Sequence, residues 1–188
     1  MTGRRERKKA ATRQSLADAA LGLALERGGY DQVTVAEIAD RADVSVTTLF
    51  THFPSKEALF FDQDASVEAA LVAAVRDRGD IPLLDALAAF AERNSRPVHQ
   101  ESPRGPSFRR LVEESPALRE YAARMWARHE QALAAAIAED RGEAAPSPST
   151  RALAHVFCGI PGLVQGPDDD AAALREATFA ILRSGWPL

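Results

Sequence analysis

Hydrophobic residues between positions 34 and 56 follow the spacing of two short helices joined by a turn. In the first helix the apolar positions recur at i, i+3, i+4 and i+7 and build one face: Val35, Ile38, Ala39 and Ala42. Thr34 precedes this run and Glu37 lies three positions later, which is the spacing of a capping box. The pattern therefore predicts a helix that begins directly after Thr34.

The second helix of the pair is predicted to begin after Ser45, a favourable N-cap, and to end at Phe53-Pro54. At 100° per residue, Leu49 and Phe53 share the inward face. The opposite face carries small hydroxyl side chains: Thr47, Thr48 and Thr51. Such side chains let a helix approach a groove closely and can bond phosphates or base edges, so this face is a candidate DNA-reading surface.

The remainder of the chain is rich in Ala, Leu, Arg and Glu and lacks the alternating β-branched runs of strands. Helical spacing, capping residues and breaks at Gly and Pro predict seven further helices at about 9–27, 55–78, 82–94, 108–114, 116–141, 150–164 and 168–184. The expected fold class is therefore all-α, with about nine helices. A bend or break is expected at Gly159-Ile160-Pro161-Gly162.

The formal net charge of −4 is unevenly distributed. Residues 1–56 carry 9 Lys/Arg and 7 Asp/Glu, a net of +2, whereas residues 57–188 carry 14 and 20, a net of −6. Near the start, six basic side chains accompany only one acidic residue, Glu6: Arg4, Arg5, Arg7, Lys8, Lys9 and Arg13. This basic arm is a candidate for phosphate or minor-groove contact, and a solubilising, disordered tail is the alternative.

The two-helix segment resembles the DNA-binding module of the TetR family of bacterial transcription regulators. The resemblance covers roughly the first third of the chain and rests on Thr34, Ile38-Ala39, Val44-Ser45, Thr48-Leu49-Phe50, His52-Phe53 and Lys56-Glu57-Ala58-Leu59. It implies a three-helix helix-turn-helix DNA-binding domain at residues 1–54 and a six-helix effector-binding and dimerisation domain at residues 55–188. Phe50 stands where the family often has Tyr. Asp43 stands where it often has Gly; Asp tolerates the turn but adds negative charge near DNA.

The resemblance, joined to the helical geometry, implies that DNA is contacted by Arg4, Arg5, Lys8, Thr34, Ser45, Val46, Thr47, Thr48, Phe50, His52 and Lys56. Residues 45–48 would approach base edges and nearby phosphates. Phe50 would pack against the DNA backbone, while His52 and Lys56 would contact phosphates. Two alternatives stay open: Val46 as a partly buried core residue, and His52 as a capped structural histidine.

In the family the last two helices form a four-helix bundle with those of a second subunit, so a homodimer is expected. Two apolar stripes are compatible with this role: Leu153, Val156 and Ile160, and Leu174, Thr178, Ile181 and Leu182. Packing within one subunit is the alternative, because periodicity does not distinguish the two. A C2 pair of recognition helices would read two half-sites about 34 Å apart in a partly palindromic operator.

The resemblance also implies a pocket for a small effector in the body of the chain. Larger or polar-tipped side chains are its candidates: Phe90, Phe108, Leu111, Met125, Trp126, His129 and Phe157. Each also fits plain core packing. Trp126 and His129 lie three positions apart and share a helical face, either as part of a pocket wall or as a surface or interface pair. The apolar character of the set favours a small hydrophobic effector, whose identity the sequence does not reveal.

Other classes of protein are disfavoured by the composition. No apolar run approaches the ~18 residues of a membrane span, and the basic start lacks the apolar segment of a secretory signal. The single cysteine, Cys158, rules out an intrachain disulfide, favours the cytoplasm and is expected to be a buried thiol rather than a redox sensor. Histidines lack paired ligand spacing, and neither a Gly-rich phosphate loop nor a nucleophile elbow is present, so no metal, cofactor or enzymatic activity is expected.

Together these features predict a dimeric, ligand-responsive transcription repressor that binds double-stranded DNA and is released by its effector. The first alternative is a DNA-binding regulator without a ligand, controlled by its abundance or by a protein partner. The second is an all-α enzyme or interaction module with an incidental helix-turn-helix, which salt-dependent DNA binding would exclude.

Overall fold

The computed structural model describes residues 3–94, 105–163 and 170–184. Within these ranges the chain forms nine α-helices and three short 3-10 helices, without a strand. The prediction of an all-α fold is therefore confirmed. The chain divides into two compact units: unit 1 comprises Met1–Asp64 and Ser102–Ala123, and unit 2 comprises Ala65–Glu101 and Arg124–Leu188.

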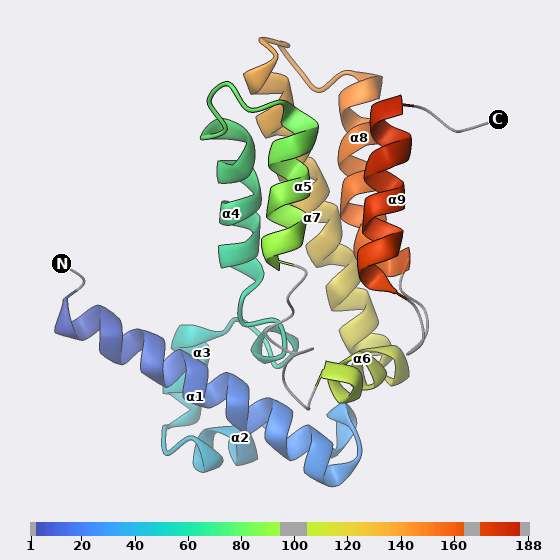
Figure 1. Cartoon of the computed structure of the whole chain (residues 1–188). Helices are drawn as coiled ribbons and strands as arrows, with labels where there is room; N and C mark the ends of the chain where they lie inside the picture. The colour runs from blue at the N-terminus through green and yellow to red at the C-terminus, as the bar shows by residue number, and fades with distance from the viewer. Residues whose placement is uncertain (1–2, 95–104, 164–169, 185–188) are drawn as a thin grey trace. The chain divides into compact units, whose positions relative to one another are not determined.

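Unit 1 is built around one long helix, α1, with α2 packed beside it and α3 beside α2 (Figure 1). Its elements are α1 (Arg4–Arg27), η1 (Tyr30–Gln32), α2 (Val35–Arg41), α3 (Val46–His52), η2 (Glu57–Leu59), α6 (Gly105–Glu114) and the first turns of α7 (Pro116–Asp140). The first helix begins earlier than the predicted Lys9, because the Gly3 amide donates a hydrogen bond to Glu6 Oε2 (3.1 Å) across the first turn. It ends at Gly28, whose φ of 76° is the left-handed conformation of a glycine C-cap.

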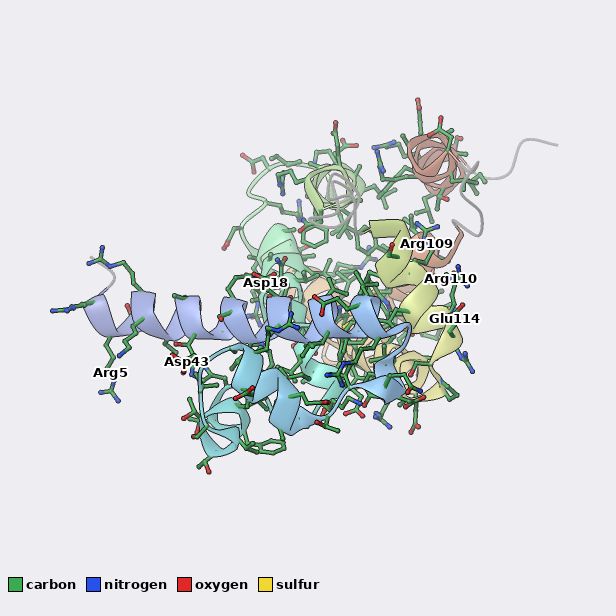
Figure 2. All side chains as sticks on the ribbon, turned by 90° about the horizontal axis from the view of Figure 1, so that it is seen from below. Arg5, Asp18, Asp43, Arg109, Arg110 and Glu114 are labelled. Carbon is green, nitrogen blue, oxygen red and sulfur yellow. The ribbon has the colours of Figure 1, made fainter. Side chains whose placement is uncertain are left out.

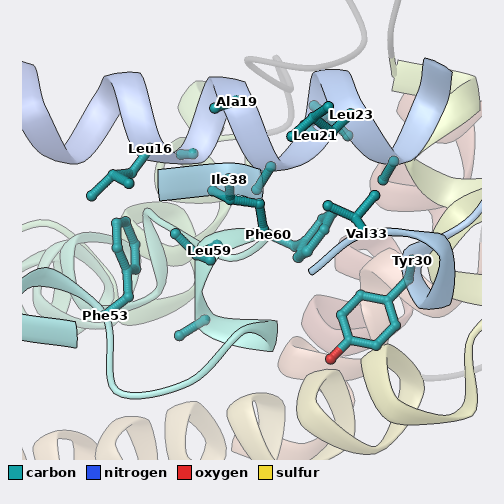
Figure 3. Packing of buried hydrophobic residues seen from close by; sticks show 14 of the residues in the cluster. Leu16, Ala19, Leu21, Leu23, Tyr30, Val33, Ile38, Phe53, Leu59 and Phe60 are labelled. Atoms are coloured by element: carbon teal, nitrogen blue, oxygen red, sulfur yellow. The ribbon is translucent and has the colours of Figure 1, made fainter. Parts of the chain in front are cut away.

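The core of unit 1 lies beneath α1, where side chains from several elements meet (Figure 3). The cluster includes Leu16, Leu23, Tyr30, Val33, Ile38, Leu49, Phe53, Leu59 and Phe60. Leu49 and Phe53 are both 0% exposed, which confirms their predicted inward orientation. Because α3 has only seven residues, the burial of these two side chains, rather than its own backbone, stabilises it.

The segment after α3 differs from the predicted helix at 55–78. Ser55 Oγ does accept the Ala58 amide (3.3 Å) as a cap, but the chain then forms the 3-10 turn η2, and α4 begins only at Asp64. Ala58, Leu59 and Phe60 are all buried in the cluster of unit 1. Three consecutive residues spread over about 200° of an α-helix and so cannot share one of its faces. These residues consequently belong to unit 1, whose first segment runs to Asp64.

Unit 2 contains roughly parallel helices packed side by side (Figure 1). Its elements are α4 (Asp64–Arg76), α5 (Leu83–Asn94), the remainder of α7, α8 (Pro148–Gly159), η3 (Ile160–Leu163) and α9 (Ala171–Ser184). Its core includes Leu71, Val75, Leu87, Phe90, Leu133, Ile137, Phe157 and Phe179. The Phe157 ring lies 6.1 Å from the Phe90 ring and 6.2 Å from the Phe179 ring, between their centroids. None of the described helices is both long and apolar enough to cross a membrane.

The ends of α8 and α9 follow local sequence signals. Ser147 Oγ accepts the Thr150 amide (3.3 Å), so α8 starts slightly before the predicted position. The predicted break at residues 159–162 is confirmed, because α8 ends at Gly159 and a 3-10 turn follows. Asp170 Oδ1 accepts the Ala172 and Ala173 amides (2.9 and 3.0 Å) at the start of α9. The other two carboxylates predicted there, at 168 and 169, lie outside the described residues.

A capping box starts α2, as the sequence predicts. Thr34 Oγ1 accepts the Glu37 amide (3.3 Å), and the Thr34 amide donates to Glu37 Oε2 (2.8 Å). Two amides that no helical carbonyl can reach are thereby satisfied. This device defines where α2 begins and how the chain enters it.

Thr34→Ala should destabilise the protein by about 1 kcal/mol, because the cap of α2 is lost. Thr12→Ala is the matched control, since the Thr12 hydroxyl bonds the Lys8 carbonyl of its own helix and caps nothing. Urea unfolding of both variants measures the difference. Equal midpoints for the two variants would show that the cap contributes no stability.

Candidate nucleic-acid interface

The turn between α2 and α3 is held by backbone hydrogen bonds. The Val44 amide donates to the Ala39 carbonyl (2.9 Å), and the Asp43 amide donates to the Asp40 carbonyl (3.0 Å). Asp43 has a φ of +53°, the left-handed conformation that glycine would adopt at least cost. Aspartate tolerates this region better than most residues, so the departure from the family pattern preserves the turn.

The outward face of α3 is open to solvent. Val46 is 40% exposed and Phe50 is 50% exposed, whereas Leu49 on the other face is fully buried. Thr47 and Thr51 are also exposed. Val46 is absent from the hydrophobic cluster of unit 1, which favours an outward role over the alternative of a partly buried core residue. Two apolar side chains and adjacent hydroxyls therefore form one protruding surface.

The hydroxyl groups of α3 differ in what they already bind. Ser45 Oγ accepts the Thr48 amide (3.1 Å) and shares a hydrogen bond with Thr48 Oγ1 (2.9 Å), so this pair forms the N-cap. Thr51 Oγ1 donates to the Thr47 carbonyl (3.0 Å). Thr47, one turn earlier and exposed, is the hydroxyl side chain best placed for an external partner.

Lys56 is directed toward Tyr30 of the same unit. Its Nζ donates to the Tyr30 carbonyl (2.8 Å) and lies 3.8 Å from the centroid of the Tyr30 ring. Burial lowers the pKa of Lys56, while the carboxylates of Asp31, Glu57 and Glu37 act in the opposite direction. An ammonium has three donors, so Lys56 can keep its bond to the Tyr30 carbonyl and still donate to a phosphate, as predicted.

His52 is half-buried at the end of α3. Its Nδ1 has no hydrogen-bond partner within the part of the chain that the structure describes. Burial lowers the pKa of His52, and the charges of Lys9 and Arg13 lower it further. Both effects favour the neutral imidazole, which can offer a phosphate one N–H donor.

The basic start of the chain is helical from Arg4 onward rather than a disordered tail. Arg4, Arg5 and Lys8 are exposed on the first turns of α1. Figure 2 shows the Arg5 side chain extending away from the ribbon. The predicted DNA contacts of unit 1 thus include a basic helix start as well as the outward face of α3.

The predicted effector residues fall into different units. Phe108 and Leu111 pack against the cluster of unit 1, and the Phe108 ring lies 5.8 Å from the Phe61 ring. Phe90 and Phe157 belong to the core of unit 2, whereas Met125 is buried but is a member of neither core cluster. Two of the seven candidates thus belong to unit 1, and the other five belong to unit 2.

Trp126 and His129 do share one face of α7, as predicted, with ring centroids 5.3 Å apart in an edge-to-face arrangement. His129 is 1% exposed, and its Nε2 lies 3.8 Å from Glu68 Oε2 of α4. This places a carboxylate beside a buried imidazole inside unit 2. Glu68 and His129 are far apart in the sequence, so a search for closely spaced metal ligands could not reveal that they lie together.

Residues of the predicted dimer stripes are mostly half-buried. Leu153, Ile160 and Leu182 pack against the core of unit 2, whereas Val156 is 42% exposed. The periodic pattern missed Phe179, the residue of α9 that is buried most deeply among those described. Cys158 is buried, and burial raises the pKa of its thiol to about 12, which supports an inert thiol.

Two family models match the chain. The model described as bacterial regulatory proteins of the tetR family matches residues 16–62, and the model described as the MftR C-terminal domain matches residues 82–187. The first match covers the helix-turn-helix, and the second covers more than half of the chain. Fold and matches together define a helix-turn-helix transcriptional regulator, a class of protein that binds DNA. The chain belongs to the TetR family of bacterial regulatory proteins.

The curated relatives described next align with this chain over only part of their own length. TcmR of Streptomyces glaucescens, a helix-turn-helix transcriptional regulator, is 39% identical over 90 residues, which cover 47% of this chain and 39% of TcmR. KstR of Rhodococcus jostii, a transcriptional repressor, is 50% identical over 44 residues, which cover 23% of this chain and 20% of KstR. The chain thus aligns with less than half the length of either relative.

Solved structures match over nearly the whole chain. A TetR-family regulator of Mesorhizobium loti has a TM-score of 0.57 at 20% identity, with 94% of this chain and 96% of that one covered. FadR of Bacillus subtilis, solved with stearoyl-CoA, has a TM-score of 0.55 at 18% identity, with 93% and 99% covered. At these identities the likeness establishes the fold.

The ion pair between α1 and α2 predicts a pH dependence of stability. Arg27 donates to Glu37 Oε1 (2.5 Å) and, with the Thr34 amide and hydroxyl, lowers the pKa of Glu37 from 4.5 to about 2. The contacts of ionised Glu37 therefore stabilise the folded state fully above about pH 5, and this contribution is lost as the pH falls from about 4.5 to about 2. The stability difference between wild type and Glu37→Gln should therefore shrink across that window.

Urea unfolding at pH 7, 4 and 2.5 measures this difference. Arg27→Met should lower the same pH dependence, because it removes the partner that depresses the Glu37 pKa most. A difference between wild type and Glu37→Gln that is as large at pH 2.5 as at pH 7 would contradict the assignment.

Proposed function

We propose that this protein is a homodimeric transcription repressor that binds a partly palindromic operator and is released by a small hydrophobic effector. The observation that carries the proposal is the two-sided character of α3. Leu49 and Phe53 anchor one side in the core, while Val46, Thr47 and Phe50 project from the other. A short, anchored helix with an open face of small and apolar side chains suits insertion into a major groove.

The chemistry of this face supports sequence-specific contact. The methyl groups of Val46 and Thr47 can touch a thymine methyl, and the Thr47 hydroxyl can bond either kind of base edge. Phe50, half exposed beside them, is suited to pack against the sugar-phosphate backbone. Arg4, Arg5 and Lys8 add positive charge at the start of α1, which supports phosphate or minor-groove contact.

Dimerisation is supported by the outer surfaces of α8 and α9. Each helix exposes small or apolar residues at i, i+4 and i+7: Ala152, Val156 and Gly159 on α8, and Ala173, Ala177 and Ala180 on α9. Such faces allow helices of two copies to approach closely in a four-helix bundle. Two copies would present two recognition helices to half-sites about 34 Å apart.

Effector control is supported by the interior of unit 2. Its core is aromatic and aliphatic, and Trp126 packs edge-to-face on the buried His129, which lies beside Glu68. FadR of Bacillus subtilis, which has the same fold, was solved with stearoyl-CoA, so an acyl chain is a reasonable first ligand to test. Release would require the effector to favour the conformation that does not bind DNA. KstR of Rhodococcus jostii, 50% identical over 44 residues, is a repressor.

Phe50→Ala and Thr47→Ala should each weaken operator binding by about tenfold, because each removes a contact from the reading face. Fluorescence anisotropy with duplexes tiled across the DNA beside its own gene, at several salt concentrations, provides the measurement. Ile81→Ala is the matched control, since Ile81 is 53% exposed and lies in unit 2. Wild-type affinity in both α3 variants would show that another face reads DNA.

Val156→Glu should convert the dimer into monomers and abolish tight operator binding, because it places a charge in the proposed four-helix interface. Light scattering after size-exclusion chromatography reports the mass directly. Ile81→Glu adds the same charge to another exposed apolar position of unit 2 and should leave the dimer intact. A dimer that survives Val156→Glu would exclude this face.

Stearoyl-CoA should change the emission of Trp126 and release the operator duplex, because a ligand inside unit 2 would alter the surroundings of that ring. Trp186→Phe removes the second tryptophan, so the emission then reports on Trp126 alone. Free coenzyme A is the control for the polar part of the ligand. Release without a change in emission would place the effector elsewhere, and an absence of release by acyl ligands would favour regulation without a hydrophobic effector.

A further inference from the structure

Arg13 of α1 makes three contacts with segments that are distant in sequence. One guanidinium nitrogen donates to the carbonyl of His52, the last residue of α3, at 2.6 Å. The other donates to the carbonyl of Asp62, in the turn before α4, at 2.8 Å. The central carbon of the guanidinium lies 4.0 Å from the centroid of the Phe53 ring. One side chain therefore links α1, the end of α3 and the connection to α4.

These contacts match what the end of a short helix requires. The last carbonyls of an α-helix have no partner within the helix, and the C-terminal end of the helix dipole favours a positive charge. Arginine offers a planar fork of donors that can bond two carbonyls while its flat face lies over an aromatic ring. Phe53 lies beneath α1 beside Leu16, one turn along from Arg13 (Figure 3).

The surroundings distinguish Arg13 from its basic neighbours. Arg4, Arg5, Arg7 and Lys8 are exposed, whereas Arg13 is half-buried. Both of these guanidinium hydrogen bonds end on backbone carbonyls of unit 1. Because its guanidinium is already bonded to two carbonyls, Arg13 is less available for a phosphate contact than the exposed side chains at the start of α1.

We propose that Arg13 is a positioning residue for DNA recognition, which holds the C-terminal end of α3 against α1 and thereby sets the orientation of its reading face. It acts through His52, Phe53 and the turn at Asp62, without touching DNA. Charge alone does not suffice for this role, because the compact ammonium of a lysine lacks the planar fork that bonds two carbonyls while its flat face covers the ring. The inference rests on the proposed function, since it assigns Arg13 a part in operator binding.

Operator binding by Arg13→Lys and Arg13→Gln tests the positioning role. Both variants should bind the operator on the order of tenfold more weakly, while the slope of log K against log salt stays unchanged. Arg110→Lys, the same substitution at an exposed position of α6, should bind as wild type does. Wild-type affinity in Arg13→Lys would overturn the proposal. So would a slope reduced by about 0.9 in Arg13→Gln alone, the mark of a lost phosphate contact.

Amide hydrogen exchange in the DNA-free protein separates positioning from general loss of stability. In Arg13→Lys, peptides covering residues 46–53 should exchange faster, while those covering residues 35–41 keep wild-type protection. Equal acceleration in both segments would indicate destabilisation of the whole unit and overturn the proposal, as would unchanged exchange in α3. If wild type binds no duplex, the proposed function fails, and the exchange result still decides whether Arg13 holds α3.

Discussion

The candidate DNA-binding face of α3 depends on the burial of Leu49 and Phe53 beneath α1. A seven-residue helix does not persist alone in water, because nucleation costs more than so few hydrogen bonds return. Both side chains are fully buried in the cluster that contains Leu16 and Ile38, and each such burial contributes about 1.5–3 kcal/mol. Since they lie four positions apart on one side of α3, the same contact leaves Thr47 and its neighbours on the open side.

Charge in unit 1 is divided between structural and exposed positions. Arg27 pairs with Glu37 and Arg41 pairs with Glu26, at 2.5 Å and 2.9 Å, and both pairs connect α1 with the segment of α2. Exposed pairs of this kind contribute little stability each. These pairs neutralise two arginines of unit 1, so the positive excess is left at the exposed start of α1. A chain of net charge −4 can approach DNA only where such a local excess exists.

Local sequence signals were sufficient to predict the helix-turn-helix but not the structure of the segment that follows it. The caps at Thr34 and Ser45 bond residues three positions away, so their spacing is visible in the sequence. The late start of α4 was not visible, because residues 58–60 form a tight turn in order to reach a core supplied by distant segments. Phe179 was missed for a related reason: helical periodicity identifies a stripe on α9, but only packing shows which member is buried.

The sequence by itself determined the two short helices, the inward and outward sides of α3 and the family, since these follow from spacings of three or four residues within one helix. Only the tertiary structure decided which basic side chains are structural. Arg13 reaches carbonyls 39 and 49 residues away, and Lys56 reaches one 26 residues away. The tertiary structure likewise placed Phe108 and Leu111 in unit 1. The reason is physical: a guanidinium, an ammonium or an apolar ring fits several partners equally well, and the packing of distant segments selects among them.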